Sequence, residues 1–237
     1  MPTRATRLPA DERKRRIIES ARGVFAASNY WKVSIADLAR AAGVSEPALY
    51  RYFPSKKEIF LSTIKTTAPK LLDSWQRVAE EVDDPLETLW SIGVGYYDHL
   101  KSRSAVMKLQ FQALVEADAP DIRKALHENF SSFVDFFAEI MEDGKARGQV
   151  RDDVDVRAGA WHFLGMGLTL DTMHLLDFDG AITRQRVETW VRFLIDSLRA
   201  EKPEGRLQPV GAAVPYDHLP SVPASVEGMM IPDRPAS

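Results

Sequence analysis

Apolar side chains recur every three to four residues along most of the chain, and no run of alternating apolar and polar residues is long enough to indicate a sheet. This pattern predicts a first helix from about Asp11 to Ala27, then two short helices over 34–42 and 45–52. A fourth helix begins at Ser55, and Pro69 is expected to kink or split it. Longer helices are predicted over 84–101, 105–116, 121–147, 155–176 and 183–200. The predicted fold class is therefore all-α.

Charge divides the chain into a basic beginning and an acidic remainder. Residues 1–60 carry twelve Lys or Arg and six Asp or Glu, which sum to +6, whereas residues 61–237 sum to −9. A basic segment of this kind favours a polyanionic partner such as nucleic acid, and a chance fluctuation of surface charge is the alternative.

We predict three parts on these grounds: a small helical domain over 1–54 that starts with a flexible arm of about ten residues, a larger helical body over 55–201, and a tail over 202–237. The tail holds seven of the fourteen prolines and few apolar residues at helical spacing. Such a composition buries too little surface to offset the entropy of ordering, which predicts an extended or disordered segment.

Signatures of catalysis and metal binding are missing from the sequence. The chain has no cysteine, which excludes disulfides, thiolate nucleophiles and cysteine-ligated zinc. Gly93-Val94-Gly95 and Gly165-Met166-Gly167 begin like dinucleotide-binding loops but lack the third glycine, so close approach of helices is the better interpretation. The five histidines never stand four residues apart. We predict no catalytic residue, metal site or cofactor.

Membrane insertion is also not predicted. The longest stretch without a charged side chain, 158–170, has thirteen residues, and a membrane-spanning helix needs roughly 20. The first residues include Arg4 and Arg7 but no apolar segment of the kind found in secretory signals. We expect a cytoplasmic protein with no membrane partner.

The most informative segment is 33–53, in which a short helix, a turn with Gly43 and a second short helix follow one another as in a helix-turn-helix. Ala39 is small where the two helices would cross. The second helix would present Glu46, Pro47, Ala48 and Arg51 to a major groove, and an ordinary helical hairpin is the alternative. The predicted DNA-binding residues, which include hydroxyls, a lysine and helix starts suited to phosphates, are Ser34, Ser45, Glu46, Pro47, Ala48, Tyr50, Arg51, Tyr52 and Lys56.

This segment resembles the tetracycline-repressor (TetR) family of bacterial transcription regulators. The likeness runs from about Arg15 to Phe60 and is carried by Phe25 and by the segments 34–39, 43–45 and 49–58. By this resemblance Tyr50, Tyr52 and Lys56 would hold phosphates, and Pro47, Ala48 and Arg51 would face bases. Glu46 departs from the small or basic residue often found at its position. A carboxylate is repelled by phosphates, so Glu46 would face DNA favourably only by accepting from a cytosine amine.

The resemblance also implies a homodimer in which the last two helices of each chain form a four-helix bundle. The apolar stripe of the final helix fits this independently, and burial of the stripe within one subunit is the alternative. The predicted interface residues are Gly165, Val187, Trp190, Val191, Leu194 and Leu198.

The body is expected to hold a small-molecule pocket between its helices, because such pockets are mostly apolar with a few polar anchors. Simple packing in the core is the alternative for each candidate. The predicted lining residues are Trp90, Tyr97, His99, Met107, Phe111, Phe137, Trp161, His162 and Met166.

Together these features predict a sequence-specific DNA-binding regulator, a ligand-responsive repressor that binds a palindromic double-stranded operator as a homodimer and responds to an apolar or amphipathic effector. A regulator without an effector, or an activator, is the first alternative. An all-helical enzyme that carries a helix-turn-helix is the second.

Overall fold

The computed structural model describes residues 9–200, and within this range it contains helices and no strand, which confirms the all-α prediction. The first three helices are α1 (Ala10–Ala27), α2 (Ile35–Ala42) and α3 (Glu46–Tyr50). We call residues 10–54 the head. Its helix α3 is shorter than the eight residues predicted, because the chain turns at Arg51 and Tyr52. The predicted arm and tail lie outside the described residues.

The fourth predicted helix is split in two, as its proline suggested. Helix α4 (Lys56–Lys65) ends at Thr66, and α5 (Thr67–Glu81) begins at the next residue. Pro69 is the third residue of α5, where a backbone N–H would have no partner inside the helix, so the proline is tolerated there. The hydroxyl of Thr66 donates to the Ser62 carbonyl at 2.9 Å and closes the end of α4.

The remaining helices begin at strong local signals. They are α6 (Pro85–Asp98), a 3₁₀ turn η1 (Lys101–Arg103), α7 (Ser104–Val115), α8 (Pro120–Ala146), α9 (Val156–Leu175) and α10 (Arg184–Leu198). Asp84 caps α6 by accepting from the Glu87 N–H at 2.9 Å, and Asp155 and Thr183 cap α9 and α10. Gly148 (φ 72°) follows α8 in the left-handed conformation that glycine tolerates best. We call α5–α10 the body.

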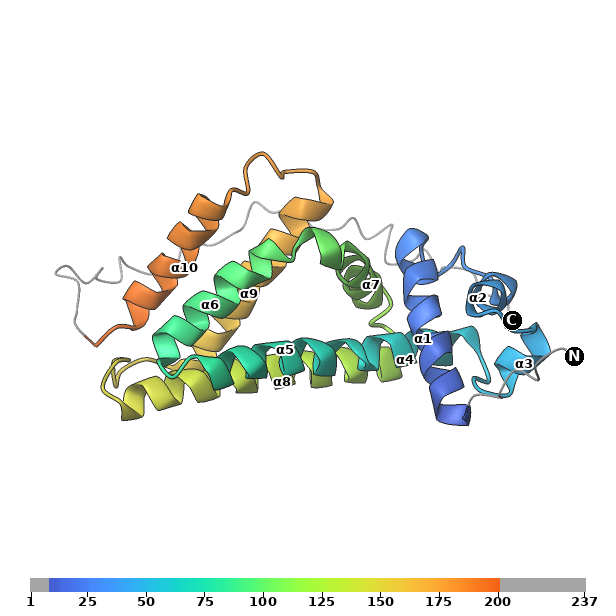
Figure 1. Ribbon diagram of the computed structural model, residues 1–237, viewed down its shortest axis with the longest axis horizontal. Helices are drawn as coiled ribbons and strands as arrows, with labels where there is room; N and C mark the ends of the chain where they lie inside the picture. The colour runs from blue at the N-terminus through green and yellow to red at the C-terminus, as the bar shows by residue number, and fades with distance from the viewer. Residues whose placement is uncertain (1–8, 201–237) are drawn as a thin grey trace, which may run out of the picture. The chain divides into compact units, whose positions relative to one another are not determined.

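Figure 1 shows how these helices lie: α4 and α5 follow one another along α8, while α6 and α9 cross above them and α10 lies on the outer side of α6. Buried apolar residues form two clusters. One joins the head to α4, α7 and the start of α8, and the other fills the body. The half-buried Phe130 of α8 packs against both. The core of the head thus continues past residue 54, since Ile59, Phe60 and Ile64 of α4 belong to it.

Two glycines of α6 show why Gly93-Val94-Gly95 is a packing feature. A Cβ on Gly93 would lie 2.8 Å from the Val191 Cγ2 of α10, whereas one on Gly95 would have nothing within 4 Å. At Gly93, α6 and α10 are thus too close to leave room for a side chain without a shift of Val191.

This difference predicts opposite effects for one substitution at two neighbouring positions. Gly93→Ala should lower the free energy of unfolding by about 1–3 kcal/mol, because the added methyl group overpacks the contact with Val191. Gly95→Ala should be neutral or raise it by up to about 1 kcal/mol, because alanine restricts the unfolded chain. Urea unfolding of both variants tests this, and equal effects would show that α6 and α10 do not meet at Gly93.

Candidate DNA-binding surface and ligand cavity

The helix-turn-helix is held by local hydrogen bonds that its sequence supplies. Ser34 caps α2: its hydroxyl oxygen accepts from the Asp37 N–H at 3.1 Å, and the Asp37 carboxylate accepts from the Ser34 N–H and hydroxyl at 3.1 and 2.6 Å. These bonds from Ser34 hold the pKa of Asp37 below its ordinary value. Gly43 (φ 66°) ends α2, and the Ser45 hydroxyl accepts from the Ala48 N–H at 3.3 Å to start α3.

The structure gathers the predicted DNA-binding residues on α3 and on the starts of α2 and α4. Ala48, Tyr52 and Lys56 are half-buried and the other six are exposed. The Ser34 hydroxyl donates to Asp37, so its role in this structure is the helix cap. The contacts of all nine with DNA stay predictions.

Lys56 is more constrained than the sequence suggested. Its ammonium donates to the Val33 carbonyl at 3.1 Å and lies over the rings of Tyr30 and Trp31, 4.7 and 5.9 Å from their centres. Burial lowers the pKa of Lys56, and the nearby Glu116 carboxylate opposes this shift. An ammonium has three N–H donors, so the carbonyl does not exhaust its capacity for a phosphate.

Helix α7 holds the head from the side of the body. The Gln112 side-chain amide donates to the carbonyls of Phe25 and Ser28, at 2.8 and 2.9 Å, at the end of α1. Just past the end of α7, Glu116 accepts from the Trp31 indole N–H at 2.5 Å. These contacts, which the sequence did not predict, fasten α7 to the head at two points.

A second connection lies at the break between α4 and α5. Arg22 of α1, only 9% exposed, donates to the Thr66 hydroxyl at 3.3 Å and to Glu19 at 3.1 Å. Lys70 of α5 pairs with the same glutamate at 2.9 Å, and its hydrogen bond lowers the pKa of Glu19. From α8, the Asn129 amide donates to the Ile64 carbonyl at 3.1 Å. The break is thus held by α1 and α8.

The predicted dimer stripe of α10 is mostly buried within the subunit, so that part of the prediction is corrected. Val187, Val191, Leu194 and Leu198 are at most 9% exposed and belong to the core of the body. The prediction of an apolar stripe on this helix was right. Periodicity alone, however, does not tell whether such a stripe is buried in the subunit's own core or in an interface with a partner subunit.

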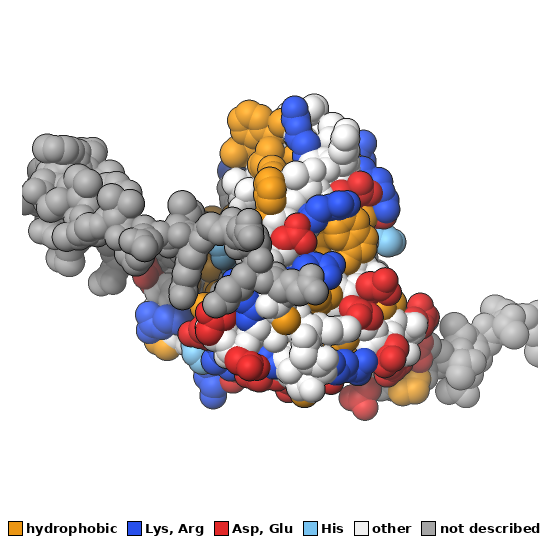
Figure 2. All heavy atoms as spheres, turned by 90° about the vertical axis from the view of Figure 1, so that its left-hand side faces the viewer, with side chains coloured by type: hydrophobic (Ala, Val, Ile, Leu, Met, Phe, Trp, Pro, Cys, Tyr) orange, Lys and Arg blue, Asp and Glu red, His pale blue; other side chains and the backbone are white. Residues whose placement is uncertain are grey.

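A different face of α9 and α10 is apolar and exposed. Figure 2 shows the end of the body at which α10 lies, where apolar side chains reach the surface between charged ones of both signs. Phe193 is 69% exposed and Trp161 51%. Three predicted interface residues, Gly165, Trp190 and Leu194, line a shallow groove with Phe193.

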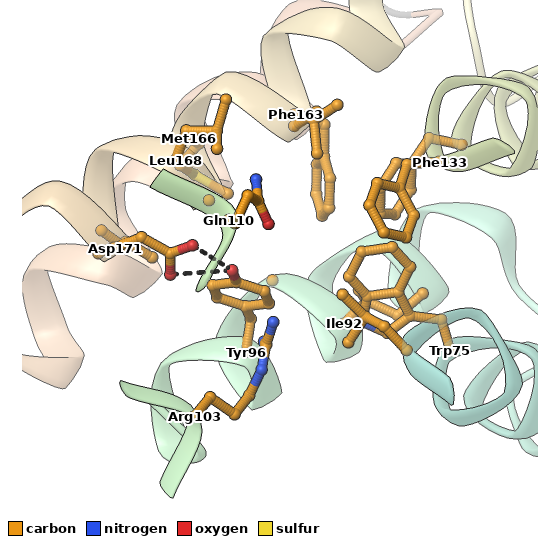
Figure 3. A pocket seen from close by; sticks show the side chains of 16 residues that line it. Trp75, Ile92, Tyr96, Arg103, Gln110, Phe133, Phe163, Met166, Leu168 and Asp171 are labelled. Atoms are coloured by element: carbon orange, nitrogen blue, oxygen red, sulfur yellow. Dashed lines mark hydrogen bonds between the residues drawn. The ribbon is translucent and has the colours of Figure 1, made fainter. Parts of the chain in front are cut away.

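Between α5, α6, α8 and α9 lies a narrow apolar cavity of about 30 Å³. Five aromatic side chains surround it (Figure 3): Trp75, Tyr96, Phe133, Phe137 and Phe163. Trp75 lies against both Phe133 and Phe137, with ring centres 5.3 and 4.9 Å apart. Its apolar lining with a few polar groups at one end makes it a candidate for a small-molecule site in the described part of the chain.

Only Phe137 and Met166 of the nine predicted lining residues reach this cavity. Met107 is buried elsewhere in the core, and Phe111 does not line the cavity. His99, Trp161 and His162 are exposed. Trp90 lies under Arg192 at the outer surface, and the Tyr97 hydroxyl donates to the Ile182 carbonyl. Aromatic residues at helical spacing identify packed positions, but not which of them surround a gap.

The polar end of the cavity was missed. There the Tyr96 hydroxyl lies 2.9 Å from both carboxylate oxygens of Asp171, and the Arg103 guanidinium lies 4.0 Å from the centre of the Tyr96 ring. Asp171 is 2% exposed. A usable signal was present, because Asp171 is the first charged residue after the longest uncharged stretch of the chain.

Burial dominates the electrostatics of this end. It raises the pKa of Asp171 from 3.8 to about 6, against the opposing effects of the Tyr96 hydrogen bond and the charges of Arg103 and His174. Burial and the Asp171 charge also raise the pKa of Tyr96 above its ordinary value. The tyrosine therefore stays protonated, and its hydroxyl donates a hydrogen bond to the carboxylate.

A second narrow cavity of about 20 Å³ lies toward the head. It shares Leu71, Arg103, Gln110 and Phe133 with the first cavity, and it reaches Ile64 and Thr67 on either side of the break between α4 and α5. The linings of the two cavities together extend from Asp171 on α9 to the α4–α5 break.

No cluster of three metal-ligating side chains occurs among residues 9–200. None of the helices that the structure describes is long and apolar enough to cross a membrane.

Comparisons with known proteins agree with the helix-turn-helix and the fold. Residues 17–63 match the model of bacterial regulatory proteins of the tetR family. The transcriptional activator FasR of Mycolicibacterium smegmatis is 28% identical over 109 residues, which are 46% of this chain and 50% of FasR, so the match spans half the length of that relative.

Two solved structures are similar over most of the chain. The regulator FadR of Bacillus subtilis, solved with stearoyl-CoA, has a TM-score of 0.66 at 18% identity and covers 78% of this chain and 99% of its own. A transcriptional regulator of Saccharomonospora viridis, solved with choline, has a TM-score of 0.69 at 22% identity, with 81% and 100% covered. At these identities the likeness shows the fold alone.

The raised pKa of Asp171 predicts how stability depends on pH. Between about pH 4 and 6 the folded protein holds the Asp171 proton more tightly than the unfolded chain does, so this group lowers stability as the pH rises through that range. Asp171→Asn, which keeps an acceptor for Tyr96, should raise the free energy of unfolding at pH 7.5 by about 1–3 kcal/mol. The gain should shrink as the pH falls below 6.

Chemical unfolding at pH 7.5 and pH 5 provides the measurement. Asp73→Asn is the matched control, because Asp73 is exposed on α5. A pH-independent loss of stability in Asp171→Asn would show that the carboxylate is not a buried charge.

Proposed function

For this chain, a DNA-binding transcriptional regulator that belongs to the TetR family, we propose the function of a ligand-responsive repressor that acts in the cytoplasm. A homodimer would hold a near-palindromic operator through its two heads, and a small apolar or amphipathic molecule in the body would release it. The observation that carries this proposal is the aromatic cavity, whose lining includes residues of the helices that hold the head.

Helix α7 supports one route from the cavity to the head. Arg103, immediately before α7, and Gln110 line both cavities, while Gln112 binds the end of α1 and Glu116 binds Trp31. A ligand that moves α7 would displace the head through these bonds. Coupling of this kind is usually worth about 1–3 kcal/mol, or roughly 5–150-fold in affinity.

The break between α4 and α5 supports a second route. The cavities reach it at Ile64 and Thr67, and α4 carries Lys56, the predicted phosphate contact, at its other end. The break has no continuous helical hydrogen-bond ladder, so α4 is able to change its angle to α5 at a modest cost.

One of the two similar structures was solved with an amphiphile, which supports an amphiphilic effector for this chain. FadR of Bacillus subtilis was solved with stearoyl-CoA and the Saccharomonospora viridis regulator with choline. Activation is the second candidate, and it is favoured by one observation: the relative FasR is named an activator.

Operator binding is tested most simply by retention of random duplex DNA on the full-length protein, followed by sequencing and titration at several salt concentrations. Arg51→Ala should relax the preference at one base position, at a cost of about 1–3 kcal/mol. Lys56→Ala should weaken all sequences alike and flatten the plot of log K against log salt by about one unit. Lys124→Ala, an exposed lysine of α8, is the control. A salt slope near zero for the intact protein would contradict DNA binding by the head.

The homodimer is proposed to form through the exposed face of α9 and α10 that includes Gly165, Trp190 and Phe193. Phe193→Asp should give monomers, because it places a charge in an apolar interface, and a near-palindromic operator should then be bound weakly. Val115→Asp is the matched control, since Val115 is 77% exposed on α7. Sedimentation velocity decides the matter, and a Phe193→Asp variant that remains fully dimeric would place the interface elsewhere.

A further inference from the structure

The polar end of the aromatic cavity carries two charged side chains, the buried Asp171 and the half-buried Arg103. Asp171 has a short side chain, lies on α9 and is 2% exposed. Tyr96 donates to it, and among the residues that the structure describes no cationic side chain forms an ion pair with it. Arg103 is longer, half-buried and placed at the end of η1. The carboxylate is therefore the rigid feature that a ligand meets.

Arg103 also shows where a positive charge is stabilised. Its guanidinium lies over the face of Tyr96, 4.0 Å from the ring centre, and the hydroxyl of the same ring binds Asp171. A cation over an aromatic face is attracted by the ring, more strongly where water is excluded. The protein's own cation thus occupies a position that combines a ring face with a nearby carboxylate.

We propose that the effector is a monovalent organic cation, an alkyl- or arylammonium with an apolar body. Its charged head would replace Arg103 on the Tyr96 face and pair with Asp171, and its body would lie among Trp75, Phe133 and Phe163. This inference rests on the proposed function, in that it takes the cavity to be the effector site. An anionic head would have to approach the buried carboxylate of Asp171, whereas a cationic head would pair with it after displacing the half-buried Arg103.

The same exchange gives the ligand a direct effect on α7. Arg103 is the residue before the first residue of α7, and Gln112 holds the end of α1 from the far half of that helix. Displacement of Arg103 from the ring would therefore act on the helix that is fastened to the head.

Four molecules with one ten-carbon chain separate the head groups: decylammonium, decyltrimethylammonium, decanol and decanoate. Each is titrated into the full-length protein by calorimetry, and operator affinity is measured with and without each. Both ammonium compounds should bind at least about tenfold more tightly than decanol, because a buried carboxylate and a ring face favour a cation. Decanoate should bind most weakly.

Two substitutions identify the groups responsible. Asp171→Asn should abolish the preference for ammonium over decanol, while Asp73→Asn on the exposed side of α5 should keep it. Arg103→Gln should strengthen ammonium binding severalfold, because it removes the competing cation. Thermal unfolding of each variant establishes that it is folded.

The outcomes distinguish the ligand class from the regulatory function. Tightest binding of decanoate, lost in Arg103→Gln, would overturn the proposal, and release of the operator by decanoate would still support a ligand-responsive repressor. Preferential ammonium binding that leaves operator affinity unchanged would support the ligand class and contradict release. Failure of all four to bind a protein that retains its operator would overturn the proposal and remove this cavity as the effector site.

Discussion

The packing of α7 into two cores at once is the constraint on which the rest of this structure depends. Leu109 and Ala113 of this helix are buried with the head, whereas Met107 is buried with the body. Gln112 adds two hydrogen bonds to carbonyls at the end of α1. Because interiors are close-packed and deform little, a shift of α7 on its body side has to be accommodated on its head side. A DNA-binding head with its own separate core would not be subject to this constraint.

The body keeps one feature that lowers its own stability. A buried carboxylate costs free energy unless it is well compensated, and burial dominates at Asp171, where the pKa is raised to about 6. An asparagine would fit the same hydrogen bond with Tyr96 without that cost. Costs of this kind are expected at functional sites, and here the cost falls at the polar end of the cavity that we assign to the effector.

Much of the fold could be predicted because its helix boundaries are set locally. Ser34, Ser45, Ser55 and Asp84 each cap the helix that follows with a side-chain acceptor, and such signals are readable from a few neighbouring residues. The break at Thr66 followed from Pro69 in the same way.

The site could be predicted only in part, because it depends on contacts between distant segments. The spacing of Val187, Val191 and Leu194 predicted an apolar stripe. Their burial against α6 and α9 depends on tertiary packing, which the spacing of residues along one helix does not predict. The same holds for Gln112, whose partners at the end of α1 lie more than eighty residues earlier. Asp171 was within reach of sequence reasoning, as the lone acid at the edge of an apolar helix.

The central claim is that α7 joins the cores of the head and the body into one cooperative unit. Native-state hydrogen exchange of a variant with a substitution on the body side of α7 tests it most directly. Met107→Ala should destabilise the body by about 2–5 kcal/mol through a cavity in its core. If α7 joins the two cores, the slowest amides of α1 should lose protection together with those of α6, because both depend on the same cooperative unit. Loss of protection in α6 with unchanged protection in α1 would show that the head is stable by itself, which would contradict the account.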